Sequence, residues 1–507
     1  MASGHINPSL AVARALVDEG HVVHYLSREQ MKEAIEGTGA SYHPEVEELP
    51  EMYEGRQLDI MGALTDLQKE YGLEHEPVFK SLMKLREIMF EKQLPGTLRW
   101  LKRTQADVVV CCSLMSKEAC LAAQVLGIPC VGIMTTAGPG SIAQATSEML
   151  SQMGMTPDNC IEERRTYRPL LDAIDRLRSE YKLDYEIDED FVPFGRCATA
   201  MRSTLTLVTT VEILADPVSH ELQQLYDETK TDFVFVGPLL DKQGAKRAAG
   251  HKYKTENETV KRETVKMHSA DTRDPLSMLR RARAAGRPVI LASMGTVITG
   301  DGPMVGWASR LVTVEGVEEG LTGKQLCHAA WGGLFDAFGK DSEDEGPLLL
   351  LSQGPQADAL DDLQVPKNAC CRPIMPQVDI LKEGIDMFLT HGGQNSFMES
   401  LSSGVPVVVC PGFGDQPVNA QKAVDLGVGL QVVRPKCDIS EAVNEAAKYR
   451  EATRMAVLEV MAGAEFKAKA AECAQEMRDA GGVPRATNLI LEVARASRQM
   501  LGQLGGA

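Results

Sequence analysis

The residues best suited to chemistry lie in one stretch between Phe388 and Gln416. Its first part, F-L-T-H-G-G-Q-N-S-F-M-E over 388–399, combines a short apolar strand, a turn with two glycines and a helix that opens with small polar residues. The start of such a helix presents unpaired backbone N–H groups and the positive end of the helix dipole, which together favour a diphosphate. Asp415 and Gln416 follow a second apolar strand and suit sugar hydroxyls. The stretch therefore predicts a site for a nucleotide joined through two phosphates to a sugar.

The role predicted for His391 depends on its neighbours in the sequence. Alone at the end of a strand it would be a structural histidine with satisfied hydrogen bonds, but Gly393, Asn395 and Ser396 beside it favour phosphate binding. Glu399 lies one turn beyond Asn395 on the same helix face, where its carboxylate can accept two hydrogen bonds from a ribose diol. The alternative for this residue is an ordinary exposed glutamate.

The sequence M-G-T at 294–296 gives a weaker signal. It follows an apolar strand, so Gly295 would let the backbone approach a ligand closely while Thr296 adds a hydroxyl. Asp415 and Gln416 also have a second interpretation, because the two could simply cap their own loop.

Parallel strands are needed to bring these residues together, and both halves of the chain supply them. Apolar segments of strand type alternate with helical ones, beginning with a helix predicted from Asn7 to Val17. This alternation is typical of a parallel, doubly wound sheet, in which ligands bind at the carboxyl ends of the strands. Strands are predicted at 21–26, 106–111, 130–134, 204–209 and 233–236 in the first half, and at 288–293, 348–351, 387–390 and 407–410 in the second.

The expected fold class is α/β, with two such Rossmann-like domains facing each other across a cleft. The first domain is predicted over 1–240 and the second over 276–484, joined by a polar, lysine-rich linker at 241–275. The stretch 300–345, which includes an acidic run, is expected to be a surface insertion. Residues 485–507 are expected to form a terminal helix and tail.

Composition narrows the classes of partner. The 507 residues carry a net charge of −18, which argues against binding to nucleic acid or to an anionic membrane. No run reaches the ~18 apolar residues of a membrane span, and the N-terminus does not read as a signal peptide, so a cytosolic protein is expected. The twelve cysteines show no metal-ligand spacing, and the acidic residues 188–190 are expected to be solvated surface. No metal or other cofactor is expected.

The chain resembles the UDP-dependent glycosyltransferases of the two-domain GT-B type, and most of all their soluble, bacterial macrolide-glycosyltransferase-like branch. The likeness covers most of the chain outside the linker and the 300–345 stretch, and its donor signature is highly specific. The motifs that carry it are P-Q-V-D-I-L at 376–381, T-H-G-G-Q-N-S at 390–396, Glu399, G-V-P at 404–406, Asp415-Gln416, G-H-I-N-P at 4–8, L-G-I-P at 126–129 and F-V-G-P at 235–238.

The resemblance implies a binding role for each residue of the donor site. Gln394 stands where the plant branch has tryptophan, as in the bacterial branch. The implied contacts are Gln377 with the uracil, Glu399 with the ribose, His391, Ser396 and Thr296 with the diphosphate, and Asp415 and Gln416 with the sugar, with Gly393 and Asn395 in the same site.

The resemblance also implies that His5, three residues before Pro8, is the catalytic base. A histidine just ahead of a helix N-terminus feels positive potential, which favours the neutral imidazole that can accept a proton. The implied mechanism is a single inverting displacement. His5 takes the proton of an acceptor hydroxyl, the oxygen attacks the anomeric carbon of a hexose, and UDP leaves without help from a metal.

Two departures from the family pattern affect the acceptor half. Cys112 stands where the family has an aspartate that pairs with the histidine, so the basicity and orientation of His5 are open. Either activity is lower, or the acceptor hydroxyl is acidic enough to need little help, or another group substitutes. The apolar strand that precedes G-H-x-N-P in the family is also missing, and an incomplete N-terminus is expected, with a shortened sheet as the alternative.

The expected function is therefore transfer of a hexose from a UDP-sugar to a hydroxyl of a small lipophilic acceptor. Methionine-rich segments at 45–100 and 141–200 either fill a core or form an adaptable apolar wall for that acceptor. The alternatives are a non-catalytic UDP-sugar-binding protein and a GT-B nucleotide-sugar epimerase. The expected assembly is a monomer or weak dimer.

Overall fold

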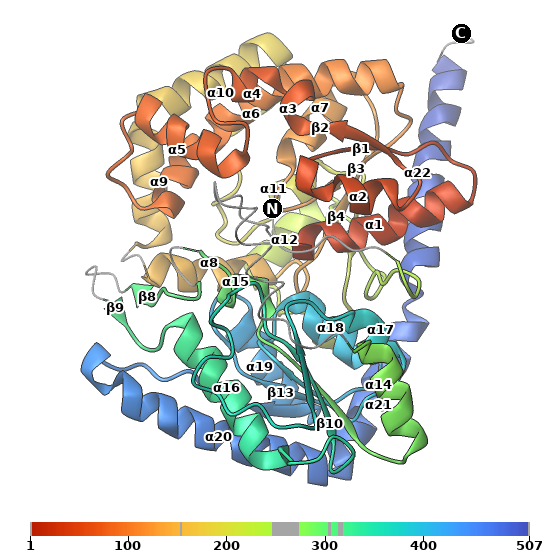
Figure 1. The fold of residues 1–507 in the computed structure, drawn as a ribbon. Coiled ribbons are helices and arrows are strands. Elements are labelled where there is room, and N and C mark those ends of the chain that lie inside the picture. The colour runs from red at the N-terminus through yellow and green to blue at the C-terminus, as the bar shows by residue number, and fades with distance from the viewer. Residues whose placement is uncertain (1–2, 153–154, 246–272, 303–305, 313–317, 505–507) are drawn as a thin grey trace. The chain divides into compact units, whose positions relative to one another are not determined.

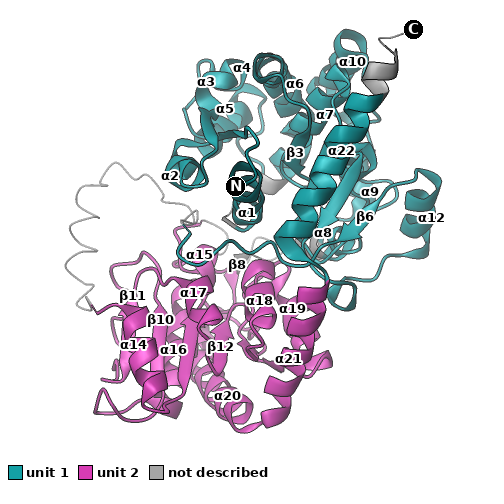
Figure 2. Cartoon of the chain, turned by 90° about the vertical axis from the view of Figure 1, so that its right-hand side faces the viewer, with its two compact units in different colours: residues 1–151, 155–249, 480–507 teal, residues 152–154, 250–479 magenta. Residues whose placement is uncertain are grey.

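Two compact units make up the chain in its computed structural model, which describes residues 3–152, 155–245, 273–302, 306–312 and 318–504. One unit comprises residues 1–151, 155–249 and 480–507, and the other comprises residues 152–154 and 250–479 (Figures 1 and 2). The linker predicted at 241–275 falls mostly on residues 246–272, which lie outside the described residues. No described helix combines the length and the apolar character that crossing a bilayer requires.

The first unit contains a four-stranded sheet in which every pairing is parallel. Its strands lie in the order β3-β4-β5-β6, and all five residues of β4 are buried because helices cover the sheet. The crossover from β3 to β4 is α7, which ends at Gly127 in a left-handed conformation with a φ of 66°. The four strands are β3 (Val109–Cys112), β4 (Cys130–Met134), β5 (Leu205–Val208) and β6 (Phe233–Phe235).

A second, separate sheet in this unit pairs β1 (His24–Ser27) with β2 (Ser41–Pro44), also in parallel. Among the described residues no strand joins β1 to β3, so the parallel strands of this unit are divided between two sheets. Helix α1 (Ser3–Asp18) packs against both groups. Its Ile6 and Leu10 belong to the apolar cluster that also contains β1 residues, and its Val12 and Leu16 belong to the cluster of β4 and β5.

Helix α1 begins four residues earlier than the sequence predicted, so Pro8 lies inside it. Pro8 lies beyond the first turn of α1, so the helix forfeits one backbone hydrogen bond there. His5 therefore lies in the first turn of α1 rather than ahead of it.

The remaining helices of the first unit form its outer layers and include the C-terminal α22. Ala486 and Ile490 of α22 are fully buried in the cluster of β4 and β5, and α22 packs beside α1 (Figure 1). The helices are α2 (Lys32–Glu36), α3 (Glu45–Glu48), α4 (Pro50–Tyr53), α5 (Ile60–Glu70), α6 (Val78–Thr104), α7 (Lys117–Leu126), α8 (Ser141–Gln152), α9 (Pro157–Thr166), α10 (Arg168–Tyr181), α11 (Ala198–Arg202), α12 (His220–Glu228) and α22 (Gly482–Leu504), with short 3-10 helices η1 (Glu29–Met31) and η2 (Glu212–Leu214).

A buried network of ion pairs joins α6, α7 and α9 of this unit to the loop that carries residues 188–190. Glu87, fully buried, accepts from Arg164 at 2.7 Å, and Lys117 contacts both Glu189 and Asp190. The sequence-based expectation that 188–190 is solvated surface is therefore wrong for Glu189 and Asp190. Cations projecting from neighbouring helices surround these two carboxylates, which a local pattern does not reveal.

The second unit has a continuous sheet of six parallel strands in the order β11-β10-β7-β12-β13-β14. The chain enters at β7, builds outward through β10 to β11, and then returns to the other side of β7 with β12. Doubly wound sheets bind ligands at such a reversal of strand order. The strands are β7 (Val289–Ser293), β10 (Leu348–Ser352), β11 (Ala369–Arg372), β12 (Met387–Thr390), β13 (Val407–Val409) and β14 (Gly429–Gln431).

Much of the stretch expected as a surface insertion is core in the structure. Helix α16 (Gly323–Phe338) is part of the connection from β7 to β10, packs against α20, and buries Trp331 and Leu334 completely (Figure 1). A capping box between Thr322 and Gln325 starts this helix. The prediction is corrected for 323–338, because this helix is rich in apolar residues and buries them in the core of the second unit. The acidic residues at 341–345 are largely exposed, as expected.

The other elements of this unit complete its helical layers. They are α14 (Pro275–Ala284), α15 (Gly295–Ile298), a small antiparallel pair β8 (Leu311–Val312) and β9 (Glu318–Glu319), α17 (Gln377–Lys382), α18 (Gln394–Ser402), α19 (Gln416–Asp425), η3 (Ile439–Glu441), α20 (Ala442–Ala462) and α21 (Ala464–Asp479).

Candidate active site

The predicted donor residues of the second unit gather where the sheet changes direction. Strands β7 and β12 are neighbours, with Ser293 opposite Thr390, so the loops that follow them leave the same edge of the sheet. Gly295 and Thr296 begin α15 after β7, and His391 follows β12 directly. The two segments that the sequence separates by almost a hundred residues thus meet at the carboxyl ends of adjacent strands.

His391 and Gly295 are in direct contact across this edge. A Cβ atom added at Gly295 would lie 2.4 Å from His391 Nε2, and the φ of Gly295 is +74°, so both space and backbone conformation require glycine there. Burial lowers the pKa of His391 to about 4, although a hydrogen bond with the backbone of Ser293 opposes that effect. The imidazole is therefore neutral at physiological pH, and its single N–H can either keep the bond to the Ser293 backbone or turn to a diphosphate oxygen.

The start of α18 is built around Gly393 and Gln394. Gly393 is the N-cap residue, and a Cβ atom there would lie 2.6 Å from His391 Nε2. The backbone N–H of Gln394 donates to the Asp415 carboxylate at 2.9 Å. Asn395 and Ser396 follow in the first turn and are half-buried, whereas Thr296 is exposed at the start of α15.

Asp415 and Gln416 have backbone partners in this structure. Asp415 caps α18, and Gln416 Oε1 accepts from the N–H groups of Gly412 at 2.7 Å and Phe413 at 3.2 Å. Their side chains therefore order the loops beside the helix start. Contacts with a sugar stay a prediction for both residues.

Gln377, Ser396 and Glu399 form a hydrogen-bonded group beside the helix start. Gln377 Nε2 donates to Glu399 Oε2 at 2.7 Å and to Ser396 Oγ at 3.1 Å. Glu399 is only 3% exposed, so the alternative of an ordinary exposed helix glutamate is wrong. The group places a buried carboxylate and an amide side by side, as a ribose and a base would require.

Gln394 is a residue of this site whose role the sequence did not reveal. Its side chain is 7% exposed, and within the described residues neither its amide oxygen nor its amide nitrogen has a hydrogen-bond partner. An unpaired buried amide is rare in folded proteins and costs about 1–3 kcal/mol, so it points to a group that binds here. The only signal in the sequence was that a polar residue stands beside the two glycines.

In the first unit, His5 lies at the carboxyl ends of β3 and β4. Its Nδ1 is 2.9 Å from the Thr135 hydroxyl and 3.4 Å from the Cys112 thiol. Burial lowers the pKa of His5 to about 4, so its imidazole is neutral at physiological pH. Cys112 thus stands beside the histidine, while Thr135 is a contact that sequence reasoning missed even though it placed the preceding strand correctly.

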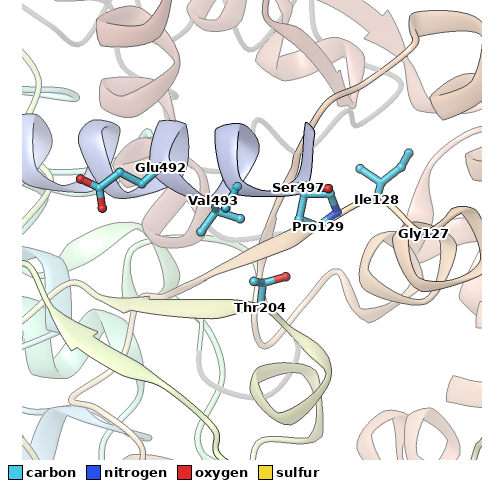
Figure 3. A pocket seen from close by; sticks show the side chains of 8 residues that line it. Gly127, Ile128, Pro129, Thr204, Glu492, Val493 and Ser497 are labelled. Atoms are coloured by element: carbon cyan, nitrogen blue, oxygen red, sulfur yellow. The ribbon is translucent and has the colours of Figure 1, made fainter. Parts of the chain in front are cut away.

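Within the described residues, no group of three or more histidine, cysteine or acidic side chains could hold a metal ion. All twelve cysteines are free thiols, and all but Cys112 are buried. A surface hollow lies between α22 and the residues that precede β4 and β5, with Pro129, Thr204 and Val493 in its lining (Figure 3). It lies at the amino ends of these strands, away from His5, and contains none of the predicted site residues.

Comparisons with known proteins agree with this geometry. Residues 360–449 match the family described as UDP-glucoronosyl and UDP-glucosyl transferase. The chain is 22% identical over 489 residues to the NDP-glycosyltransferase YjiC of Bacillus subtilis, covering 96% of this chain and 93% of that protein. It is 34% identical over 151 residues to the uncharacterized UDP-glucosyltransferase YojK of the same organism, covering 30% of this chain and 34% of that one.

Solved structures share the fold over nearly the whole chain. The calicheamicin glycosyltransferase CalG4 aligns with a TM-score of 0.59 at 17% identity, covering 97% of this chain and 96% of that one. The glycosyltransferase of kitacinnamycin aligns with a TM-score of 0.57 at 21% identity and the same coverage. The expected α/β fold with two Rossmann-like domains of the GT-B type is confirmed.

Proposed function

Because this chain belongs to the superfamily of UDP-dependent glycosyltransferases and has their GT-B fold, we propose that it transfers a hexose from a UDP-sugar to a hydroxyl of a small lipophilic acceptor, with inversion at the anomeric carbon. Membership of a transferase superfamily argues against the alternatives of a non-catalytic binding protein and an epimerase.

The observation that carries the donor part of this proposal is the cluster at the start of α18. His391 lies over Gly295, the Gln377–Glu399–Ser396 group lies beside it, and the buried amide of Gln394 has no partner in the described chain. A uridine diphosphate sugar offers groups that suit this cluster: diphosphate oxygens for the helix N–H groups and His391, and a diol for the Glu399 carboxylate. The sugar would occupy the side of Asp415 and Gln416.

The proposed chemistry is a single displacement. His5 Nε2 accepts the proton of the acceptor hydroxyl while the oxygen attacks the anomeric carbon, and the bond to the diphosphate breaks with its electron pair. Attack from the face opposite the leaving group inverts the configuration. The positive end of α18 and the neutral imidazole of His391 would stabilise charge on the departing UDP, so we propose no metal or other cofactor.

A lipophilic acceptor is favoured by the helices of the first unit. Met52 and Met83 fill its core, whereas Met61 on α5 is 54% exposed, so an adaptable apolar side chain is available at the surface. The solved glycosyltransferases that share the fold include the calicheamicin glycosyltransferase CalG4.

Transfer of radiolabelled glucose from UDP-glucose to a panel of phenols and sterols tests the proposal. His5→Ala should reduce turnover by at least about 100-fold, the scale on which a general base contributes, without changing UDP binding. His75→Ala, at a histidine whose side chain is 94% exposed, is the matched control and should leave turnover unchanged. Wild-type protein that binds neither UDP nor a UDP-hexose in calorimetry would refute the proposal.

A further inference from the structure

The contacts of the His5 ring differ in kind from a histidine–carboxylate pair. Nδ1 faces the Thr135 hydroxyl at 2.9 Å and the Cys112 thiol at 3.4 Å, and among the described residues no carboxylate contacts the ring. Thr135 is 4% exposed, so water competes little for this hydrogen bond. The ring is therefore held from two neighbouring strand ends by two groups that carry no charge.

Burial favours the uncharged forms of two titratable groups near Cys112. Tyr25 on β1 and Glu118 on α7 both act electrostatically on this region. Burial raises the pKa of Glu118 to about 8 and the pKa of Tyr25 to about 12, and burial likewise raises the pKa of the Cys112 thiol. A proton arriving on His5 thus meets no counter-ion in the described surroundings.

The orientation of the ring decides which nitrogen can react. Since Nδ1 is engaged by Thr135 and Cys112, Nε2 is the nitrogen that can face an acceptor. Nε2 accepts a proton only in the tautomer that carries hydrogen on Nδ1, and the Thr135 oxygen can accept a hydrogen bond from that N–H. Thr135 thus fixes the ring and permits the reactive tautomer, although a hydroxyl, which can also donate, does not enforce that tautomer as an acceptor-only aspartate would.

The Thr135 hydroxyl stabilises the protonated His5 ring less than a carboxylate would. A hydrogen bond in which one partner is charged is roughly twice as strong as one between neutral groups. The imidazolium formed during reaction would lack that extra stabilisation. The acceptor hydroxyl must then give up its proton more readily. A phenolic hydroxyl ionises at about pH 10, whereas water, which aliphatic alcohols resemble, ionises near 15.7.

We infer that Thr135 is the positioning residue of His5, and that a base held only by neutral partners restricts this enzyme to acidic acceptor hydroxyls, namely phenols. The inference rests on the proposed glycosyl transfer. In the step, the phenolic O–H bond breaks as its proton moves to Nε2, the oxygen forms a bond to the anomeric carbon, and UDP leaves with the electron pair. The imidazolium then returns its proton to solvent.

The first test compares acceptors with the wild-type protein. With UDP-glucose as donor, 2-naphthol and a series of para-substituted phenols should react with a kcat/KM at least 100-fold above that of cyclohexanol and other alicyclic alcohols of similar size. Equal transfer to both classes would overturn the inference and leave the proposed function intact. Transfer to neither class, with UDP still bound, would overturn the proposed function and this inference with it.

The second test changes the partners of His5. Thr135→Val removes the hydroxyl at constant shape and should lower kcat for phenols at least tenfold with KM and UDP binding unchanged, while Thr135→Ser should retain most of the activity. Thr209→Val, at a buried threonine that follows β5, is the matched control and should have no effect. Unchanged kcat in Thr135→Val would overturn the positioning role.

Cys112→Asp places a carboxylate beside His5. Its effect on transfer to alicyclic alcohols relative to phenols tests the predicted acceptor class. It should raise transfer to alicyclic alcohols at least tenfold relative to phenols, and it should move the acidic limb of the kcat/KM profile to higher pH, because a carboxylate stabilises the imidazolium. A merely structural effect would not change the ratio between acceptors. An unchanged ratio and an unchanged acidic limb would contradict the inference.

Discussion

The sheet of the second unit runs unbroken through six parallel strands, whereas the first unit divides its parallel strands between a sheet of four and a separate pair. The predicted donor residues of the second unit are held by one another and by backbone groups at the centre of that continuous sheet. His5 is held by two neutral side chains at the edge of a smaller one. The predicted donor site of the second unit is thus held by many contacts, whereas His5 in the first unit depends on two.

The largest expected effect is the loss of stability when a buried charge is removed from the first unit. Glu87→Ala leaves Arg164, which is itself fully buried, without its carboxylate, and should lower the free energy of unfolding by about 3–5 kcal/mol. Urea unfolding measures the loss. Glu51→Ala, which breaks the exposed pair with Arg99, is the control and should cost at most about 1 kcal/mol. Similar losses in the two variants would mean that the ion network does not hold the first unit together.

Adding a methyl group beside His391 tests how closely the predicted donor residues of the second unit are packed. Gly295→Ala places a Cβ atom against His391 in a left-handed backbone conformation, and should weaken UDP binding at least about tenfold, or 1.4 kcal/mol. Gly286→Ala has a similar φ of +69° but nothing within 4 Å of the new atom, so it should leave UDP binding unchanged. Calorimetric titration with UDP distinguishes the two. Equal affinity in Gly295→Ala and wild type would remove His391 from the donor site.

The two histidines offer a comparison through pH, because burial lowers the pKa of both His5 and His391 from 6.5 to about 4. Between these values the unfolded chain binds protons that the folded chain excludes. Stability should therefore fall as the pH drops from 6.5 toward 4, and it should be unaffected by these groups above 6.5. Urea unfolding at stepped pH should show a shallower slope for His5→Gln and for His391→Gln. An unchanged slope in one variant would show that this histidine is accessible to water.

The smallest expected effect concerns the unpaired amide of the donor half. Gln394→Leu replaces it with an apolar group of similar size and should raise the free energy of unfolding by about 1 kcal/mol, while reducing thermal stabilisation by UDP-glucose. Gln421→Leu, at an exposed glutamine of α19 that bonds Asp425, should not stabilise the protein. Loss of stability in Gln394→Leu would indicate that the amide is satisfied in the folded protein.

Strong local patterns predicted most of the strands. The segments predicted at 130–134 and 387–390 match β4 and β12 residue for residue, because both are continuous apolar runs bounded by turn residues. Strands β2, β8, β9, β11 and β14 were not predicted. The segments S-Y-H-P of β2 and G-L-Q of β14, for example, carry little apolar signal and form strands through pairing with neighbours. The resemblance to UDP-dependent glycosyltransferases of the macrolide-glycosyltransferase-like branch is confirmed.

The positions of candidate site residues could be predicted only where residue type and local position were sufficient, and their roles stay predictions. His391 and Glu399 follow from a turn and one helical repeat, whereas the unpaired amide of Gln394 and the contact between Thr135 and His5 depend on three-dimensional neighbours. For the same reason the burial of Glu189 could not be foreseen. The location in the cell, the independence from metal and the state of assembly stay predictions.

The packing of the C-terminal helix α22 on the first unit determines when that unit can finish folding during translation. Ala486 and Ile490 complete the apolar layer over β4 and β5, so that layer stays open on the ribosome until the chain has been synthesised through residue 490. The second unit, by contrast, ends at residue 479 and can close before α22 emerges. The half that appears first during translation is thus the last to finish folding, and a chaperone that shields apolar strands would act on it for longest.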